Sequence, residues 1–140
     1  MNRCLIVTMD ESAVPFVQTL HTMGVECAYL DFCAQTTLFL REQSVIAPVI
    51  KVGPHKHDVV NHEGIRQFDT AVVFEGAWLE SALIVQALKQ AGVSKVVVVA
   101  QNQSFMRAYR ALGADRVVGV RRWNRDSFRV LNGESKQRGA

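Results

Sequence analysis

Four acidic residues, Asp10, Glu11, Asp31 and Glu75, come directly after short apolar segments of this 140-residue chain. If those segments are parallel strands, the four carboxyl groups lie near one edge of a sheet. Carboxylates gathered in this way could bind a cation or an amine-bearing ligand. Alternatively, Asp10 and Glu11 offset the dipole of the helix that follows them and cap its free N–H groups. The sequence favours this second interpretation for Asp10 and Glu11.

Histidine and cysteine residues are the other candidates for chemistry. His55, His57 and His62 have the spacing H-x-H-x4-H, and histidine is a common zinc ligand. They follow the turn at Gly53-Pro54 with no cysteine nearby to complete a tetrahedral set, so we expect a solvent-facing loop and no metal site. Cys33 has no nucleophile motif around it, and the chain contains no G-x-S-x-G or Walker loop. We therefore predict no catalytic residues.

Strand-like and helical segments alternate along the chain, and this alternation predicts the scaffold that positions these residues. It is typical of a parallel sheet with right-handed crossovers, that is, a doubly wound α/β domain. The strand-like segments are residues 4–7, 25–30, 49–52, 70–74, 95–100 and 116–120. The helical segments are residues 13–23, 35–43, 58–63, 77–91 and 104–112. The helix at 77–91 is apolar around most of its circumference, so we expect it to be buried on more than one side.

The charge of the chain is divided unevenly. The net charge is +3, but residues 121–140 hold six basic and two acidic side chains, which leaves −1 on residues 1–120. We therefore predict one domain at 1–120 and a basic C-terminal tail at 121–140. The tail interleaves arginine with Trp123 and Phe128, a pattern that could contact nucleic acid. A solvated tail or a contact between subunits is the favoured interpretation.

The cellular context is predicted from what the sequence does not contain. No apolar run approaches the roughly 20 residues of a membrane span, and the N-terminus has no signal-peptide layout. The three cysteines, Cys4, Cys27 and Cys33, form no CxxC pair, which suits a reducing compartment. We expect a cytoplasmic protein that does not insert into a membrane.

Two stretches carry a resemblance to a known family. The segment Gly64–Gly76 contains a Gly-Ile pair, an aspartate, an apolar strand and a small turn, and the segment Ala111–Val118 reads Leu-Gly-Ala-Asp before its last strand. With Ala91-Gly92-Val93, these stretches resemble the N-terminal domain of Trk-type potassium-uptake proteins, also called the RCK or KTN domain. The resemblance spans about residues 3–120. It implies a Rossmann fold with a six-stranded parallel sheet in the order 3-2-1-4-5-6.

The resemblance also implies a nucleotide site at the carboxyl ends of the strands, where the strand order reverses. The residues that map there are Thr8, Met9, Asp10, Glu11, Ser12, Ala13, Asp31, Gly53, Glu75 and Gly76. Asp31 holds the position whose carboxylate accepts ribose hydroxyls. Residues 8–13 replace the glycine-rich phosphate loop. Asp10 stands where the second glycine would let the backbone approach the pyrophosphate, so the sequence predicts altered or weakened binding of NAD.

The function implied is a non-catalytic regulatory domain that senses a nucleotide or nucleoside. NAD or another adenine nucleotide is the cofactor implied by the resemblance. A homodimer is the expected assembly, with a membrane transport protein or another protein as the partner and no nucleic acid. Two alternatives stay open: a Rossmann scaffold for dimerisation that binds no ligand, and an NAD-dependent oxidoreductase. The lost phosphate loop and the absence of a substrate domain count against the enzyme.

Overall fold

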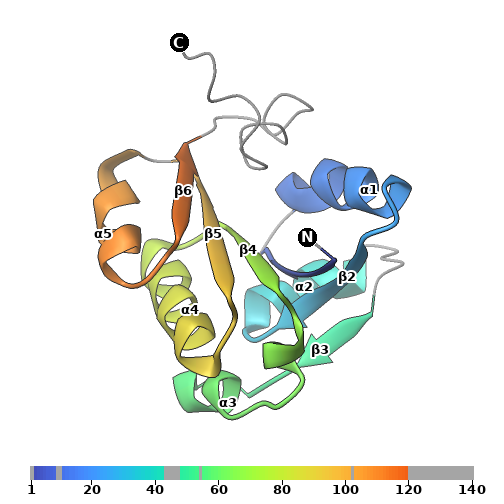
Figure 1. The fold of residues 1–140 in the computed structure, drawn as a ribbon, viewed down its shortest axis with the longest axis horizontal. Coiled ribbons are helices and arrows are strands. Elements are labelled where there is room, and N and C mark those ends of the chain that lie inside the picture. Colours follow the sequence, from blue (N-terminus) through green and yellow to red (C-terminus); the bar gives the residue numbers. More distant parts are fainter. Residues whose placement is uncertain (1, 9–10, 43–47, 54, 102, 120–140) are drawn as a thin grey trace.

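The computed structural model describes residues 2–8, 11–42, 48–53, 55–101 and 103–119 and contains a six-stranded sheet (Figure 1). Every pairing of neighbouring strands is parallel, and the strand order is β3-β2-β1-β4-β5-β6. This confirms the predicted fold class and strand order. The strands are β1 (Arg3–Val7), β2 (Glu26–Asp31), β3 (Val49–Lys51), β4 (Thr70–Phe74), β5 (Lys95–Ala100) and β6 (Arg116–Gly119).

Helices cover both faces of the sheet. One hydrophobic cluster joins α1 and α2 to one face, and a second joins α3, α4 and α5 to the other (Figure 1). The helices are α1 (Val14–Thr22), α2 (Ala34–Glu42), α3 (Lys56–Val60), α4 (Trp78–Ala91) and α5 (Met106–Ala111). Short 3-10 turns lie at Glu11–Ala13, Ile65–Gln67 and Gln103–Phe105. The turn at Ile65–Gln67 falls in a segment for which the sequence predicted no element.

Strand β1 shows how the sheet divides its side chains between these two layers. Successive side chains of a strand point to opposite faces. Cys4 and Ile6 therefore join the cluster with α1, whereas Leu5 and Val7 join the cluster with α4. All four side chains are fully buried. A strand buried on both faces in this way reads as a continuous apolar run, and such runs, without any alternating pattern, indicated the central strands in the sequence.

The helix termini follow local sequence signals. Pro15 lies in the first turn of α1, where its missing N–H costs nothing. Gly92 ends α4 in the left-handed region, with φ 101°, a conformation that side chains with a Cβ rarely adopt. The expected burial of α4 on more than one side is confirmed, because the helix packs on β4 and β5 and also against α3 and α5. Leu79 and Leu83 lie on its outer face and are 63% and 46% exposed. Only the inner face of α4 packs on the sheet.

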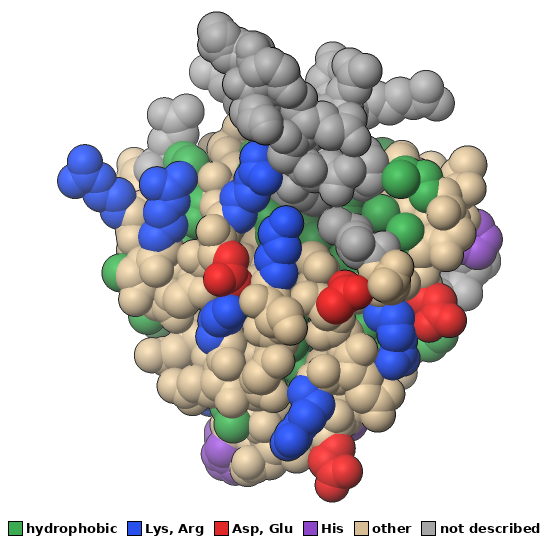
Figure 2. Space-filling view, in the orientation of Figure 1, with side chains coloured by type: hydrophobic (Ala, Val, Ile, Leu, Met, Phe, Trp, Pro, Cys, Tyr) green, Lys and Arg blue, Asp and Glu red, His purple; other side chains and the backbone are tan. Residues whose placement is uncertain are grey.

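The surface carries side chains of both charges. Basic side chains are spread over the face drawn in Figure 2, and acidic side chains lie among them. None of the described helices is both long and apolar enough to cross a membrane. The predicted tail at 121–140 lies outside the described residues, as do Met9 and Asp10.

Candidate functional site at the carboxyl edge of the sheet

The strand order reverses between β1 and β4. The chain leaves β1 toward α1 on one face and reaches β4 from α3 on the other, so the two crossovers diverge beyond the carboxyl ends of these strands. Val7 of β1 is level with Val73 of β4. In doubly wound sheets, ligands bind in the crevice at this point. Thr8 follows β1 here and is 2% exposed.

Asp31 is the last residue of β2, and its side chain is 8% exposed. Two threonines at the start of α2 hold its Oδ1 atom. The hydroxyl of Thr37 donates to Oδ1 at 2.6 Å, and Thr36 Oγ1 lies 3.2 Å from the same atom. No described residue donates to Oδ2. The side chain is therefore held in place through one oxygen, while the other can accept a hydrogen bond from a ligand.

An open pocket of about 90 Å³ lies on the side of α4, beside Phe32 and Cys33, the two residues that follow Asp31; Asp31 itself is not among its lining residues. Its lining is mostly apolar and includes the polar side chains of His55, Lys56 and Glu80. The residues that line it include Phe32, Cys33, Gly53, His55, Lys56 and Glu80. Gly53 is required by the packing, because a Cβ there would lie 2.3 Å from Asp58 Oδ2. Asp58 in turn accepts the His55 N–H at 3.1 Å and caps α3.

Glu75 follows β4 and turns inward, with 8% of its surface exposed. The phenol of Tyr109 donates to its Oε2 at 2.5 Å, and the N–H of Gln101 donates to its Oε1 at 2.8 Å. Both carboxylate oxygens are thus held by partners inside the fold. Burial, the hydrogen bond to Glu75 and the charge of Glu75 together raise the pKa of Tyr109 well above its ordinary value.

Next to Glu75, the start of α4 is tied to the sheet. The N–H of Gly76 donates to the Ser81 hydroxyl at 3.0 Å, and Ser81 is fully buried. Trp78 stacks on Phe105, with ring centroids 4.6 Å apart, and meets Tyr109 edge-on at 5.6 Å. This aromatic cluster fixes α5 against α4 at the edge where β4 and β5 end.

The segment that replaces the phosphate loop is described in part. Thr8 and Ala13 are buried, and Glu11 is exposed in the 3-10 turn that leads into α1. Met9 and Asp10 lie outside the described residues, so the predicted effect of Asp10 on a pyrophosphate stays a prediction. Among the described acids at this edge, Asp31 and Glu75 each have internal hydrogen-bond donors, which does not favour a cation-binding interpretation.

The histidines do not gather into one group. His55 and His57 stack with ring centroids 5.5 Å apart, whereas His62 accepts the N–H of Gly64 through Nδ1. Over the described parts of the chain, no three histidine, cysteine, aspartate or glutamate side chains are arranged to hold a metal ion. Cys33 lines the pocket on the side of α4.

The residues that position the two buried acids were not among those predicted from the sequence. Thr36 and Thr37 hold Asp31, and Tyr109 and Gln101 hold Glu75. The two threonines carry a usable signal, since hydroxyl side chains near the start of a helix often bond to nearby backbone groups, as Thr36 does to the N–H groups of Phe32 and Cys33. Tyr109 carries no such signal, because it is 34 residues from Glu75 in the chain.

The order 3-2-1-4-5-6 with an acidic residue at the end of β2 defines a dinucleotide-fold domain of the Rossmann class. Within that class, the sequence profile of the TrkA-N domain matches residues 4–120. The chain therefore belongs to the TrkA-N domain family. No curated protein matches it in sequence.

Solved structures share this fold at low identity. The GsuK channel bound to NAD superposes with a TM-score of 0.67 at 15% identity, over 84% of this chain and 21% of the channel chain. The TrkA-N domain of the inner membrane protein ybaL from Escherichia coli gives 0.62 at 15% identity, over 94% and 95%. The NAD(P)-binding domain of an exopolyphosphatase-related protein from Archaeoglobus fulgidus gives 0.63 at 13%, over 98% of each chain. This chain thus spans about a fifth of the channel's length.

Proposed function

We propose that this chain is a non-catalytic sensor domain whose carboxyl edge binds an adenine nucleotide or nucleoside. The observation that carries the proposal is Asp31, a buried carboxylate at the end of β2. Its Oδ1 is fixed by Thr37, and its Oδ2 has no hydrogen-bond donor among the described residues. A ribose hydroxyl is a suitable donor for that oxygen. The pocket at Phe32 and Gly53 offers an apolar surface for the face of a base.

The number of phosphates that the ligand carries should be small. Asp10 stands where a glycine normally lets the backbone approach a pyrophosphate, and Glu11 adds a second negative charge. At short range, each contact between like charges costs on the order of 1–4 kcal/mol, depending on screening. A nucleoside or monophosphate avoids most of this repulsion, so we propose that AMP-like ligands bind more tightly than NAD.

The regulatory role is supported by family membership. One protein of the same fold is a channel with NAD bound, and another is the TrkA-N domain of an inner membrane protein. We propose that this chain likewise acts in the cytoplasm, as a homodimer, and passes its ligand state to a transport protein or another protein partner. The tail at 121–140 is then a contact to a subunit or partner, and not to nucleic acid.

Native mass spectrometry of the full chain, alone and with NAD, NADH, ATP, ADP and AMP, tests this function. We expect a one-to-one complex with AMP that is detected at a lower ligand concentration than the complex with NAD. A dimer that retains none of the five ligands would instead make the chain a ligand-free scaffold. Retention of NADH with its oxidation in the presence of a carbonyl substrate would make it an oxidoreductase.

A further inference from the structure

A larger cavity, of about 740 Å³, opens at the opposite edge of the sheet, where β1, β2 and β3 begin. Its volume lies in the range of about 300–1,000 Å³ that is usual for small-molecule sites. The lining residues that matter here are Arg3, Val25, Cys27, Ile50, His62 and Phe68. None of them belongs to the nucleotide site proposed above, which lies at the other end of the strands.

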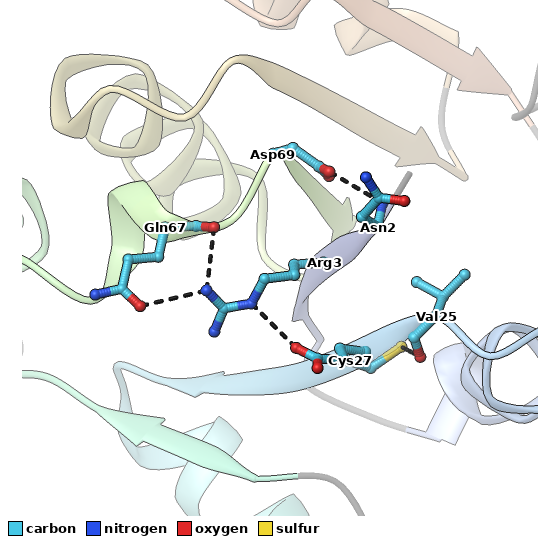
Figure 3. Close-up of polar contacts among 7 residues, drawn as sticks. Asn2, Arg3, Val25, Cys27, Gln67 and Asp69 are labelled. Atoms are coloured by element: carbon cyan, nitrogen blue, oxygen red, sulfur yellow. Dashed lines mark hydrogen bonds and ion pairs between the residues drawn. The ribbon is translucent and has the colours of Figure 1, made fainter.

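Arg3 is one of the residues that line this cavity, and Figure 3 shows its guanidinium group with its polar contacts. Its Nη1 donates to the main-chain and side-chain oxygens of Gln67 at 3.4 and 3.3 Å, and its plane lies over the ring of Phe68 at 4.9 Å. Nε is buried and lies 3.2 Å from Glu26 Oε1 without the geometry of a hydrogen bond. No described residue pairs with Nη2. The group is therefore held in place with donors to spare.

Among the described residues, β3 pairs with β2 only from Tyr29 onward, so the first residues of β2 have no described partner on this side. In the ladder with β3, the N–H of Tyr29 donates to the carbonyl of Pro48, and Val49 is level with Tyr29. At the preceding position of this ladder, the main-chain N–H of residue 48 would donate to the carbonyl of Cys27, but residue 48 is a proline and has no N–H. No described residue pairs with the main chain of Cys27 on this side. Its carbonyl can therefore accept a hydrogen bond from a molecule in the cavity.

The rest of the lining suits a ligand that is apolar and negatively charged. His62 accepts the Gly64 N–H through Nδ1, so its Nε2 carries the proton of the neutral ring and is a donor. Burial raises the pKa of Cys27 to about 11, which keeps the thiol uncharged at neutral pH. The acid nearest the guanidinium, Glu26, is 75% exposed in its side chain, so water screens its charge.

We propose that this cavity binds a small organic carboxylate that has an amide N–H beside the carboxyl group and an apolar side chain. The carboxylate pairs with Nη2 of Arg3, the amide N–H donates to the carbonyl of Cys27, and the side chain lies against Val25, Ile50 and Phe68. N-acylated apolar amino acids have this chemistry. So does the last residue of a peptide, which presents the same three groups.

Titration of the full ¹⁵N-labelled chain with N-acetyl-L-leucine, followed by amide chemical shifts, tests the proposal. We expect saturable shifts at residues 26–28 and 62–68. The matched neutral ligand, N-acetyl-L-leucinamide, should bind about 10–100 times more weakly, because a hydrogen bond to a charged group contributes about 1.5–3 kcal/mol. A short peptide ending in leucine distinguishes the two sources: tighter binding of the peptide identifies a protein carboxyl terminus, and tighter binding of the free acid a metabolite.

Two variants locate the site. Arg3→Gln should remove the preference for the acid over its amide, whereas Lys95→Gln, which also removes a positive charge from the first residue of a strand, should keep it. If Arg3→Gln does not fold, the comparison of acid and amide on the unaltered chain still decides the matter. Equal affinity for both ligands, shifts confined to residues 31 and 76, or no shift at millimolar ligand would each overturn the proposal.

Discussion

The phenol of Tyr109 donates a hydrogen bond of 2.5 Å to the carboxylate of Glu75, and both side chains are buried. Tyr109 belongs to α5 and Glu75 follows β4, so the bond joins a peripheral helix to the sheet edge proposed to bind a nucleotide. A change in the position of Glu75 must therefore displace α5 or break this bond. Helix α5 is thus the element best placed to move with that edge.

The first prediction concerns the stability that this bond provides. Tyr109→Phe leaves Glu75 Oε2 buried without its donor, so we expect the free energy of unfolding to fall by about 1–3 kcal/mol. Tyr29→Phe is the matched control, because Tyr29 is also buried and no described residue bonds to its hydroxyl. Urea unfolding of the two variants measures the difference. Equal losses in both would show that the bond to Glu75 contributes nothing.

The same pair predicts a dependence of stability on alkaline pH. Burial and the bond to Glu75 raise the pKa of Tyr109 in the folded chain above its ordinary value of 10.0. The folded chain then keeps a proton that the unfolded chain loses, so the contribution is complete below about pH 10 and falls as the pH rises above it. Above pH 10, the free energy of unfolding should fall more steeply in the wild type than in Tyr109→Phe. Parallel curves would contradict this assignment.

Local signals explain why the fold could be predicted from the sequence. The run Val96–Val99 and the segment Ala71–Phe74 are apolar at every position because both sheet faces are covered, and the structure places β5 and β4 there. The outer face of α4 could not be predicted in the same way. Leu79 and Leu83 have the same apolar character as the buried Leu88, so the local sequence does not show that these two leucines are exposed.

The third prediction concerns Gly53. Gly53→Ala should push the Asp58 carboxylate away from the N–H of His55, which removes the cap of α3, so we expect a loss of about 0.5–2 kcal/mol in unfolding free energy. Once the carboxylate is absent, the nearest atom of residue 58 to the new Cβ is its own Cβ at 3.3 Å, so most of the clash is removed. In the Asp58→Ala background, Gly53→Ala should therefore cost much less, and a double-mutant cycle by thermal unfolding measures the coupling. Additive losses would contradict the contact.

The fourth prediction concerns Asp115 under acid conditions. Burial raises its pKa, but the N–H of Val96 at 2.8 Å and the ammonium of Lys89 at 2.9 Å outweigh burial and hold the pKa below its ordinary 3.8. Its contribution is therefore present above about pH 4 and is lost as the pH falls below that value. Between about pH 6 and pH 2, the free energy of unfolding should fall less in Asp115→Asn than in the wild type. Glu63→Gln, at an exposed acid, should follow the wild type.

The candidate site could be predicted less completely than the fold. Asp31 was found because a strand-end acid is a local feature, and the structure adds that Thr36 and Thr37 hold it. The inward turn of Glu75 could not be found, since it depends on a tyrosine from a helix that packs beside it only after the whole sheet has formed. Contacts of long sequence separation leave no periodic signal in one sequence.

Calorimetric titration of AMP into the wild type and into Asp31→Asn tests whether Asp31 binds a nucleotide. Asparagine keeps the shape of the side chain but removes the charge that strengthens a hydrogen bond from a ribose hydroxyl. We predict saturable one-to-one binding to the wild type and affinity about 10–100 times weaker in Asp31→Asn, with Glu63→Gln unchanged. Identical affinity in wild type and Asp31→Asn, or no heat from AMP with either protein, would contradict a nucleotide site at the end of β2.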